Sequence, residues 1–273
     1  MRFKTTISNV PYFLKLLQAI EKIGKDIILG LSPEKLRIFL VPDQSGIKVW
    51  SELNMDTLFR NTSIESRSKN CIYIEADLGN LMHILKSNAK SQEVTVKLCK
   101  KDGLPFLTFR ITPKEDVSIT QDVAVAVLSD EDFRRLIDPP TSDTADVQIC
   151  LPSLRSFHDI VDRYKALGTQ LAVVANMDGR LSIRMETPMV TLATFYQGLT
   201  HPPLAGQGPP ARDPDRRAEV RVDIRKFVQV LRSHMLFPSN VIACLFSGRA
   251  LAIHLLLDDL YMTYLIPALA DTS

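Results

Sequence analysis

IEADLGNLMHILKSN, residues 74–88, and VRVDIRKFVQVLRSH, residues 220–234, are two copies of one pattern that align without a gap. In each copy a short alternating strand runs into an Asp, Asp77 or Asp223, which stands at the N-cap position of a helix. Apolar residues follow at helical spacing and predict one buried stripe per helix: Leu78, Leu81, Met82 and Leu85, then Ile224, Phe227, Val228 and Leu231. The copies start 146 positions apart in a chain of 273 residues, which indicates two similar tandem domains.

The segments around the two copies also repeat. Residues 1–8 alternate as a strand, and a helix follows that Ser8 and Asn9 can cap and Gly24 ends. The runs DIILGL, KLRIFLV and GIKVWSEL then predict an antiparallel meander, followed by a turn at 56–62 and a further strand at 63–68. The second half repeats this order, with a helix from Pro152 and Gly168 in the place of Gly24. The predicted fold class is α+β, with two helices in each half packed on curved antiparallel sheets.

A change of composition separates the halves. Residues 129–146 are acidic, contain Pro139 and Pro140, and allow at most one short helix at 133–137. We therefore predict domains at 1–128 and 147–273, joined by a linker at 129–146. Residues 197–217 hold five prolines and three glycines, so we expect a poorly ordered surface loop there.

Composition excludes several classes of protein. The chain is 45% hydrophobic and 23% charged, and it has neither an apolar run of membrane-spanning length nor the apolar core of a signal peptide. We expect a soluble protein inside the cell, with no membrane partner. The four cysteines stand singly, without the spacing of a zinc site or a redox motif, so we expect reduced thiols and no metal or cofactor.

Basic residues lie opposite the apolar stripes of the predicted helices, although 33 Lys and Arg against 31 Asp and Glu leave the whole chain nearly neutral. One interpretation is an ordinary solvated surface. The other is a basic surface that binds the phosphates of a nucleic acid without contacting its bases. Asp159 and Asp162 share the outer face of the helix after Pro152 and weaken the second interpretation there. The candidate DNA-facing residues are Lys15, Lys22, Lys25, Lys86, Lys90, Arg155, Arg225, Lys226 and Arg232.

Signals for catalysis are weak. His158, Asp159 and Asp162 form a conceivable acid-base group, but on one helix they are more typical of a polar surface. The chain has no glycine-rich phosphate loop, nucleophile elbow or metal-ligand spacing, so we expect no catalytic residues.

Several short sequence segments are similar to those of a known family. MRFKTTI, VWSELNMDTLF, ICLPSL, GLTHPPLA, AEVRVDIRKFVQVL and YLIPAL resemble the Hus-type subunits of the nine-one-one checkpoint clamp, within the eukaryotic sliding clamps. The resemblance implies a non-enzymatic subunit of a heterotrimeric ring with two Rad-type subunits. It further implies an ATP-dependent loader, double-stranded DNA bound without sequence specificity at sites of damage, checkpoint and repair clients, and a nuclear location. The departures are Asp159, Asp162 and residues 211–217.

Family topology also implies which strands close the ring. These edges are residues 117–128 and 188–196, with Val125, Val127, Val190 and Leu192 at the subunit interfaces, and the linker crosses the outer surface over the client groove. The alternative is a small-molecule enzyme or a generic binding module on a duplicated α+β scaffold. An enzyme would gather polar residues at strand ends, whereas here they are spread along helix faces.

Overall fold

The structure, a computed structural model, describes residues 1–41, 46–91, 93–113, 117–136, 144–202 and 217–270. The chain folds as two compact units. Unit 1 comprises Met1–Asp43, Val49–Pro140 and Asp259–Tyr261, and unit 2 comprises Gln44–Lys48, Thr141–Asp258 and Met262–Ser273. Among the described residues, no helix is both long and apolar enough to cross a membrane.

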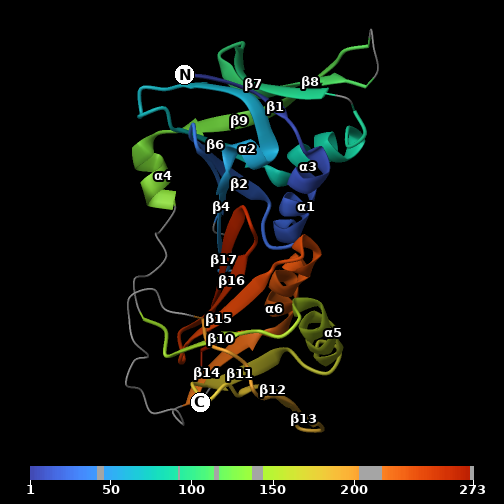
Figure 1. The fold of residues 1–273 in the computed structure, drawn as a ribbon, viewed down its shortest axis with the longest axis vertical. Helices are drawn as coiled ribbons and strands as arrows, with labels where there is room; N and C mark the ends of the chain where they lie inside the picture. Colours follow the sequence, from blue (N-terminus) through green and yellow to red (C-terminus); the bar gives the residue numbers. More distant parts are fainter. Residues whose placement is uncertain (42–45, 92, 114–116, 137–143, 203–216, 271–273) are drawn as a thin grey trace. The chain divides into compact units, whose positions relative to one another are not determined.

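Unit 1 is built from antiparallel strands with helices on both sides (Figure 1). Its strands are β1 (Arg2–Ile7), β2 (Asp26–Leu31), β3 (Lys35–Leu40), β4 (Lys48–Asn54), β5 (Phe59–Glu65), β6 (Ile72–Asp77), β7 (Glu93–Lys101), β8 (Leu104–Thr112) and β9 (Ile119–Leu128). Its helices are α1 (Val10–Ile20), α2 (Met55–Leu58), α3 (Leu78–Ser87) and α4 (Asp130–Leu136). The strand order is β4-β3-β2-β6-β9-β8-β7-β1-β5.

The buried face of unit 1 carries α1 and α3. The apolar stripe of α3 is buried as predicted, and Asp77 caps the helix by accepting a hydrogen bond from the backbone N–H of Asn80 at 2.6 Å. Asn9 caps α1 in the same way, through the N–H of Tyr12 at 3.0 Å. Phe13 of α1 meets Phe59 of β5 edge to face, with ring centroids 5.9 Å apart.

The prediction of a turn at 56–62 and a strand at 63–68 was wrong in its boundaries. Residues Met55–Leu58 form the short helix α2, and β5 already begins at Phe59. Pairing with β1 decides this, because Ile7 lies opposite Phe59 and Thr6 opposite Arg60, with a register shift between Lys4 and Thr6. A long-range ladder thus overrides the weak strand propensity of the Arg60–Thr62 stretch.

Unit 2 contains two separate groups of strands and a pair of helices. Its elements are β10 (Val147–Cys150), α5 (Leu154–Tyr164), β11 (Gln170–Asn176), β12 (Leu181–Glu186), β13 (Thr191–Tyr196), β14 (Arg217–Asp223), α6 (Ile224–Leu231), the 3-10 helix η1 (Arg232–Leu236), β15 (Asn240–Phe246), β16 (Ala250–Leu256) and β17 (Leu260–Pro267). The strand orders are β10-β15-β16-β17 and β13-β12-β11-β14. Helices α5 and α6 lie side by side and bury Phe157 against Phe227 (Figure 1).

The two copies of the repeat have the same local geometry. In unit 1 the N–H of Leu78 donates to the carbonyl of Lys25 at 2.8 Å, and in unit 2 the N–H of Ile224 donates to the carbonyl of Thr169 at 3.0 Å. Each bond ties the start of the repeated helix to the residue before the neighbouring strand. Asp223 caps α6 through the N–H groups of Arg225 and Lys226, at 2.8 and 3.1 Å.

The two glycines that end the first helix of each half also have a common role. A Cβ on Gly24 would lie 2.9 Å from the side chain of Leu40, and one on Gly168 would lie 2.8 Å from Met185 Sδ. Both glycines therefore allow the end of a helix to approach a strand closely.

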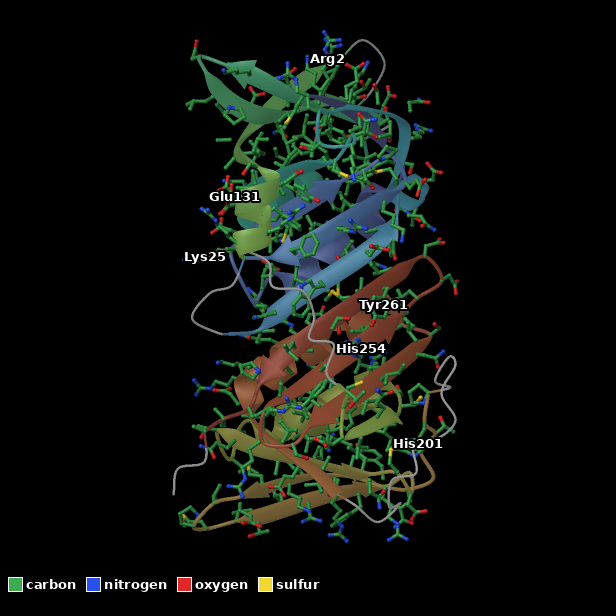
Figure 2. The ribbon with its side chains drawn as sticks, turned by 90° about the vertical axis from the view of Figure 1, so that its left-hand side faces the viewer. Arg2, Lys25, Glu131, His201, His254 and Tyr261 are labelled. Carbon is green, nitrogen blue, oxygen red and sulfur yellow. The ribbon has the colours of Figure 1, made fainter. Side chains whose placement is uncertain are left out.

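The linker and the long loop are described only in part. Residues 137–143 of the linker and 203–216 of the loop lie outside the described residues, so the boundaries 129–146 and the expected disorder stay predictions. The linker begins as α4, on the side of the unit 1 strands away from α1 and α3 (Figure 1). Figure 2 views this side, where Glu131 marks α4.

Candidate nucleic-acid interface and subunit edges

The basic residues singled out in unit 1 lie at its helices. Lys15 is on α1, Lys22 and Lys25 lie between α1 and β2, Lys86 is on α3, and Lys90 follows α3. All five side chains are exposed, whereas the apolar stripes of the same helices are buried. The fold therefore places these five cations on the helix side of unit 1.

In unit 2 the four candidates lie on three consecutive helical segments. Arg155 is on α5, Arg225 and Lys226 are in the first turn of α6, and Arg232 begins η1. Arg155, Arg225 and Arg232 are exposed, and Lys226 is half-buried. Because α5 packs beside α6, these residues come from neighbouring helices of one surface.

The acidic residues of α5 have partners that the sequence analysis did not identify. Asp162 forms an ion pair with Lys165, one turn further along. This hydrogen bond, with the charge of Lys165 and smaller effects from His158 and Arg232, holds the pKa of Asp162 below its usual value. Asp162 is therefore an ionised group whose charge is partly offset by Lys165, which weakens its effect on a nearby phosphate. The spacing from Asp162 to Lys165 is a sequence signal that could have shown this.

Two histidines meet on the same surface, which the sequence analysis also missed. The rings of His158 on α5 and His234 on η1 lie 4.9 Å apart, centroid to centroid. His158 Nδ1 is 3.3 Å from Asp159 Oδ1, and His234 Nδ1 is 3.1 Å from the carbonyl of Leu231. Asp162 is paired to Lys165, so the three residues of the conceivable acid-base group do not converge on one point. No group of three or more metal-binding side chains occurs within the described part of the chain.

The cysteines lie singly, as their spacing predicted. Cys71, Cys99 and Cys150 are half-buried free thiols, and Cys244 is buried. Burial raises the pKa of the Cys244 thiol to about 12, so it stays protonated and unreactive at neutral pH.

One expected edge strand of unit 2 is β13. In the described chain β13 pairs with β12 alone, and it stands at the end of the order β13-β12-β11-β14. Leu192 is half-buried within it, opposite Met185. Val190 lies outside the strand, in the turn that joins β12 to β13, where its N–H donates to Thr187 Oγ1 at 2.9 Å. The edge thus begins at Thr191 instead of at residue 188.

The expected edge strand of unit 1 is β9, and it has two different neighbours along its length. Residues Ile119–Ala124 pair with β8, and Val125–Leu128 pair with β6. Val125 stands opposite Ala76 and Val127 opposite Ile74, so both of these residues already take part in a ladder within unit 1. The role of β9 in a subunit interface stays a prediction, and the first half of the strand is the part that β6 does not pair.

The chain matches one protein family over nearly its whole length. A model of the family described as Hus1-like protein matches residues 1–270. The chain belongs to the Hus1-like family. It is 34% identical to the checkpoint protein hus1 homolog of Dictyostelium discoideum over 98% of this chain and 99% of that protein. It is 29% identical to the human checkpoint protein HUS1 over 99% of this chain and 100% of that protein.

Solved structures identify the fold of this Hus1-like chain. The proliferating cellular nuclear antigen of Entamoeba histolytica aligns with a TM-score of 0.72 at 13% identity, over 98% of both chains. PCNA from Thermococcus kodakaraensis aligns with a TM-score of 0.71 at 17% identity, over 98% of this chain and 100% of that one. The predicted α+β sliding-clamp fold is confirmed. Family and fold together confirm a non-enzymatic checkpoint clamp subunit that works in a multi-subunit DNA clamp.

Proposed function

We propose that this chain forms one third of a heterotrimeric ring with two Rad-type clamp subunits. An ATP-dependent loader places the ring around double-stranded DNA at sites of damage in the nucleus, and the ring recruits checkpoint and repair proteins there. The observation that carries the proposal is the family match over residues 1–270, joined to basic side chains exposed along the helices of both units.

The helix surfaces are suited to binding DNA without recognising its base sequence. Lysines and arginines neutralise phosphates and release condensed counterions, which gives affinity independent of base sequence. Eight of the nine candidates are exposed, so their charges can reach a duplex without first disrupting the core. Enclosure by a ring then supplies the retention on DNA that scattered phosphate interactions do not.

The strand edges support neighbours of two different kinds. A strand with one free edge is a template for another strand, and chains associate through such edges unless they are blocked. β13 (TLATFY) and the first half of β9 (ITQDVA) differ in sequence, so they do not form a self-complementary interface. Two unlike edges therefore favour two unlike partners.

Client proteins need an apolar surface outside the DNA-facing side. Unit 2 offers three partly exposed apolar side chains, Ile242, Phe246 and Leu265, which pack on the buried residues Ala145, Cys244 and Ala252. Ala145 comes from the last residues of the linker, and the other five come from the β15-β16-β17 meander. We propose Ile242, Phe246 and Leu265 as part of the client-binding surface.

Co-expression with both Rad-type subunits tests the assembly. We expect a complex with one copy of each chain by size-exclusion chromatography with light scattering, and retention of that complex on circular but not on linear DNA after loading. A stable homo-oligomer of this chain, or equal retention on both DNA forms, would contradict the ring.

A further inference from the structure

A basic pocket opens on unit 2 away from the proposed DNA surface. It has a volume of about 190 Å³ and lies over strands β11, β12 and β13, with Arg217 at the start of β14. Arg180, Arg184 and Arg217 line it together with Asn176, Ser182 and Phe195. No Asp or Glu is among its described lining residues. The pocket therefore concentrates positive charge and hydrogen-bond donors, and the one carboxylate paired with a lining arginine, Asp178 at Arg180, is not among the lining residues.

Strand register places most of the polar side chains of the pocket on the sheet face opposite α5. Val174, Ser182 and Phe195 lie opposite one another across β11, β12 and β13, so their side chains share one face. The next residue of each strand points to the other face, and there Tyr196 meets the ring of Phe157 on α5 at 5.7 Å. The arginine-bearing positions of β12 and β14 thus lie on the face away from the helices, while Tyr196 lines the pocket from the α5 side.

Arg184 is the central group of this pocket. Its guanidinium carbon lies 5.9 Å from the centre of the Phe195 ring, a cation-π arrangement that orients the planar head group. Its Nε is buried and has no hydrogen-bond partner among the described residues. A buried guanidinium donor without an acceptor is unfavourable, and a bound anion would relieve it.

The arginines on this face of the sheet differ in whether a carboxylate of the same chain already pairs with them. Arg180 pairs with Asp178 at 3.0 Å, and Arg221, on the same sheet face outside the pocket, lies 3.3 Å from Glu219. Within the described chain, Arg184 and Arg217 have no carboxylate partner. The hydroxyl of Ser182, a residue only 6% exposed, adds a further donor in the wall. Two unpaired guanidinium groups, with the Ser182 hydroxyl on the same strand as Arg184, suit one carboxylate or phosphate.

We propose that this pocket binds an anionic side chain, a carboxylate or a phosphate, of a partner peptide. Phe195 is 64% exposed beside Arg184, so an apolar residue next to the anion would pack on the aromatic ring. This combination favours a peptide over nucleic acid, because the pocket accommodates one isolated anion and the helices with the candidate DNA-binding residues lie on the opposite face. Phe195 belongs to β13, the proposed subunit edge, but every lining residue comes from this chain, so a test on the isolated chain is independent of the proposed clamp function.

Titration of the full chain tests the assignment. The probe is a fluorescein-labelled peptide with two glutamates flanking a phenylalanine, and matched peptides carry phosphoserine or lysine in place of glutamate. Binding is followed by fluorescence anisotropy, and the Arg184 Nε–Hε signal is followed by NMR. We expect the glutamate or the phosphoserine peptide to bind and to shift that signal, whereas the lysine peptide does neither. The stronger of the two anionic peptides identifies the anion.

Variants separate the pocket from general surface charge. Arg184→Gln and Arg217→Gln should each weaken binding by about tenfold or more, since each removes a charge-assisted bond. Arg184→Lys keeps the charge but loses Nε and should weaken binding as well. The matched control Arg221→Gln removes the same charge from the same sheet face and should change binding less than twofold. Circular dichroism melts of all variants check folding.

Three results would overturn the proposal. The first is no binding of either anionic peptide at millimolar concentration. The second is binding that Arg184→Gln and Arg221→Gln weaken equally, which would reduce the effect to surface charge. The third is displacement of the peptide by a short DNA duplex that itself shifts the Arg184 Nε–Hε signal, which would assign the pocket to nucleic acid.

Discussion

The ring of Phe133 stacks on the ring of Tyr73, with centroids 3.9 Å apart and planes 9° from parallel. Phe133 also meets Phe39 edge to face at 5.1 Å. Phe39 and Tyr73 belong to β3 and β6, on the face away from α1 and α3, so one side chain of α4 attaches the start of the linker to unit 1. α4 has seven residues and is too short to be stable without such packing.

Replacing Phe133 by Ala should therefore release α4 while the rest of unit 1 stays folded. An aromatic pair contributes about 0.5–1.5 kcal/mol beyond the area that it buries. Hydrogen exchange should become faster in residues 130–135, and the control Arg134→Ala, at an exposed position of the same helix, should leave it unchanged.

The same variant should change the titration of Tyr73. Burial, with smaller contributions from Cys71 and Asp130, raises the pKa of Tyr73 above its usual 10.0. Removal of the stacked ring readmits water, so the pKa should fall toward that value. Ultraviolet absorbance titration of the full chain measures it, and an unchanged pKa together with unchanged exchange would show that Phe133 does not hold α4.

The two Asp caps should contribute unequally to stability. Asp223 accepts from two backbone N–H groups and Asp77 from one. Replacement of an N-cap by Ala costs about 1 kcal/mol, with a range of roughly 0.5–2, so Asp223→Ala should lie toward the upper end and Asp77→Ala nearer the middle. Urea unfolding checks this, and Asp→Asn at each position should cost little because Asn also caps. The reverse order would refute the assignment of the caps.

Glu52 predicts an acid dependence of stability. Lys35 and Arg37 both donate hydrogen bonds to the Glu52 carboxylate, and Arg37 Nε lies 2.8 Å from Glu52 Oε2. The bond from Lys35, followed by the bond from Arg37, holds the pKa of Glu52 below its usual 4.5. A carboxylate with a lowered folded pKa stabilises the protein above its unfolded pKa, and this contribution is lost as pH falls through the folded value. Because these side chains are partly exposed, the contribution should stay below about 1 kcal/mol. The difference in unfolding free energy between wild type and Glu52→Gln should be present at pH 7 and should shrink as pH falls below 4.5. A difference that stays constant over the acid range would assign it to packing.

The helix cations should determine the salt dependence of DNA binding. In the assembled ring, replacing Lys15, Lys22 and Arg232 together by Ala should flatten the slope of log affinity against log salt by about 0.9 for each phosphate that is no longer neutralised. The matched control replaces Lys4, Lys97 and Arg110, which are exposed cations on strands β1, β7 and β8. The helix variant should weaken retention on every duplex alike and still form the trimer. Equal effects of both triples, or weaker binding to some sequences only, would mean that the helix cations are merely solvated.

Neighbouring proline substitutions should locate the free edge of β13. Successive N–H groups of a strand point to opposite sides, so one of Leu192 and Ala193 donates toward β12 and the other toward solvent. Proline at the outward position should keep the fold and abolish one subunit interface, whereas proline at the inward position should destabilise unit 2. Circular dichroism and co-purification with each partner distinguish them. If neither variant affected assembly, β13 would not be an interface.

Local patterns predicted the helices of the repeat correctly. Asp77 and Asp223 cap α3 and α6, and all eight residues of the two predicted stripes are buried. Capping and helical periodicity involve residues within four positions of one another, so they can be recognised in the chain alone. The sequence segments shared with the family likewise identified the clamp fold.

Pairs of residues from distant segments were not predicted. Asn88 is buried, and its amide donates to the carbonyl of Ile84 at 2.7 Å and to Gln121 Oε1 at 3.2 Å. The approach of His158 to His234 joins positions 76 residues apart, and the stack of Phe133 on Tyr73 joins positions 60 apart. No local spacing encodes such pairs.

The sequence by itself determined the duplication, the α+β class, the capped helices and the exposed cations opposite their apolar stripes, because each depends on the order of nearby residues. Tertiary structure alone decided that β5 starts at Phe59, that Val125 and Val127 pair with β6, and that Arg184, its Nε buried, lines one pocket with Arg217. Strand partners and pocket walls come from segments far apart in the chain. Their positions follow from which ladders and packed faces form together, and a one-residue shift of register would turn every side chain of a strand to the other face.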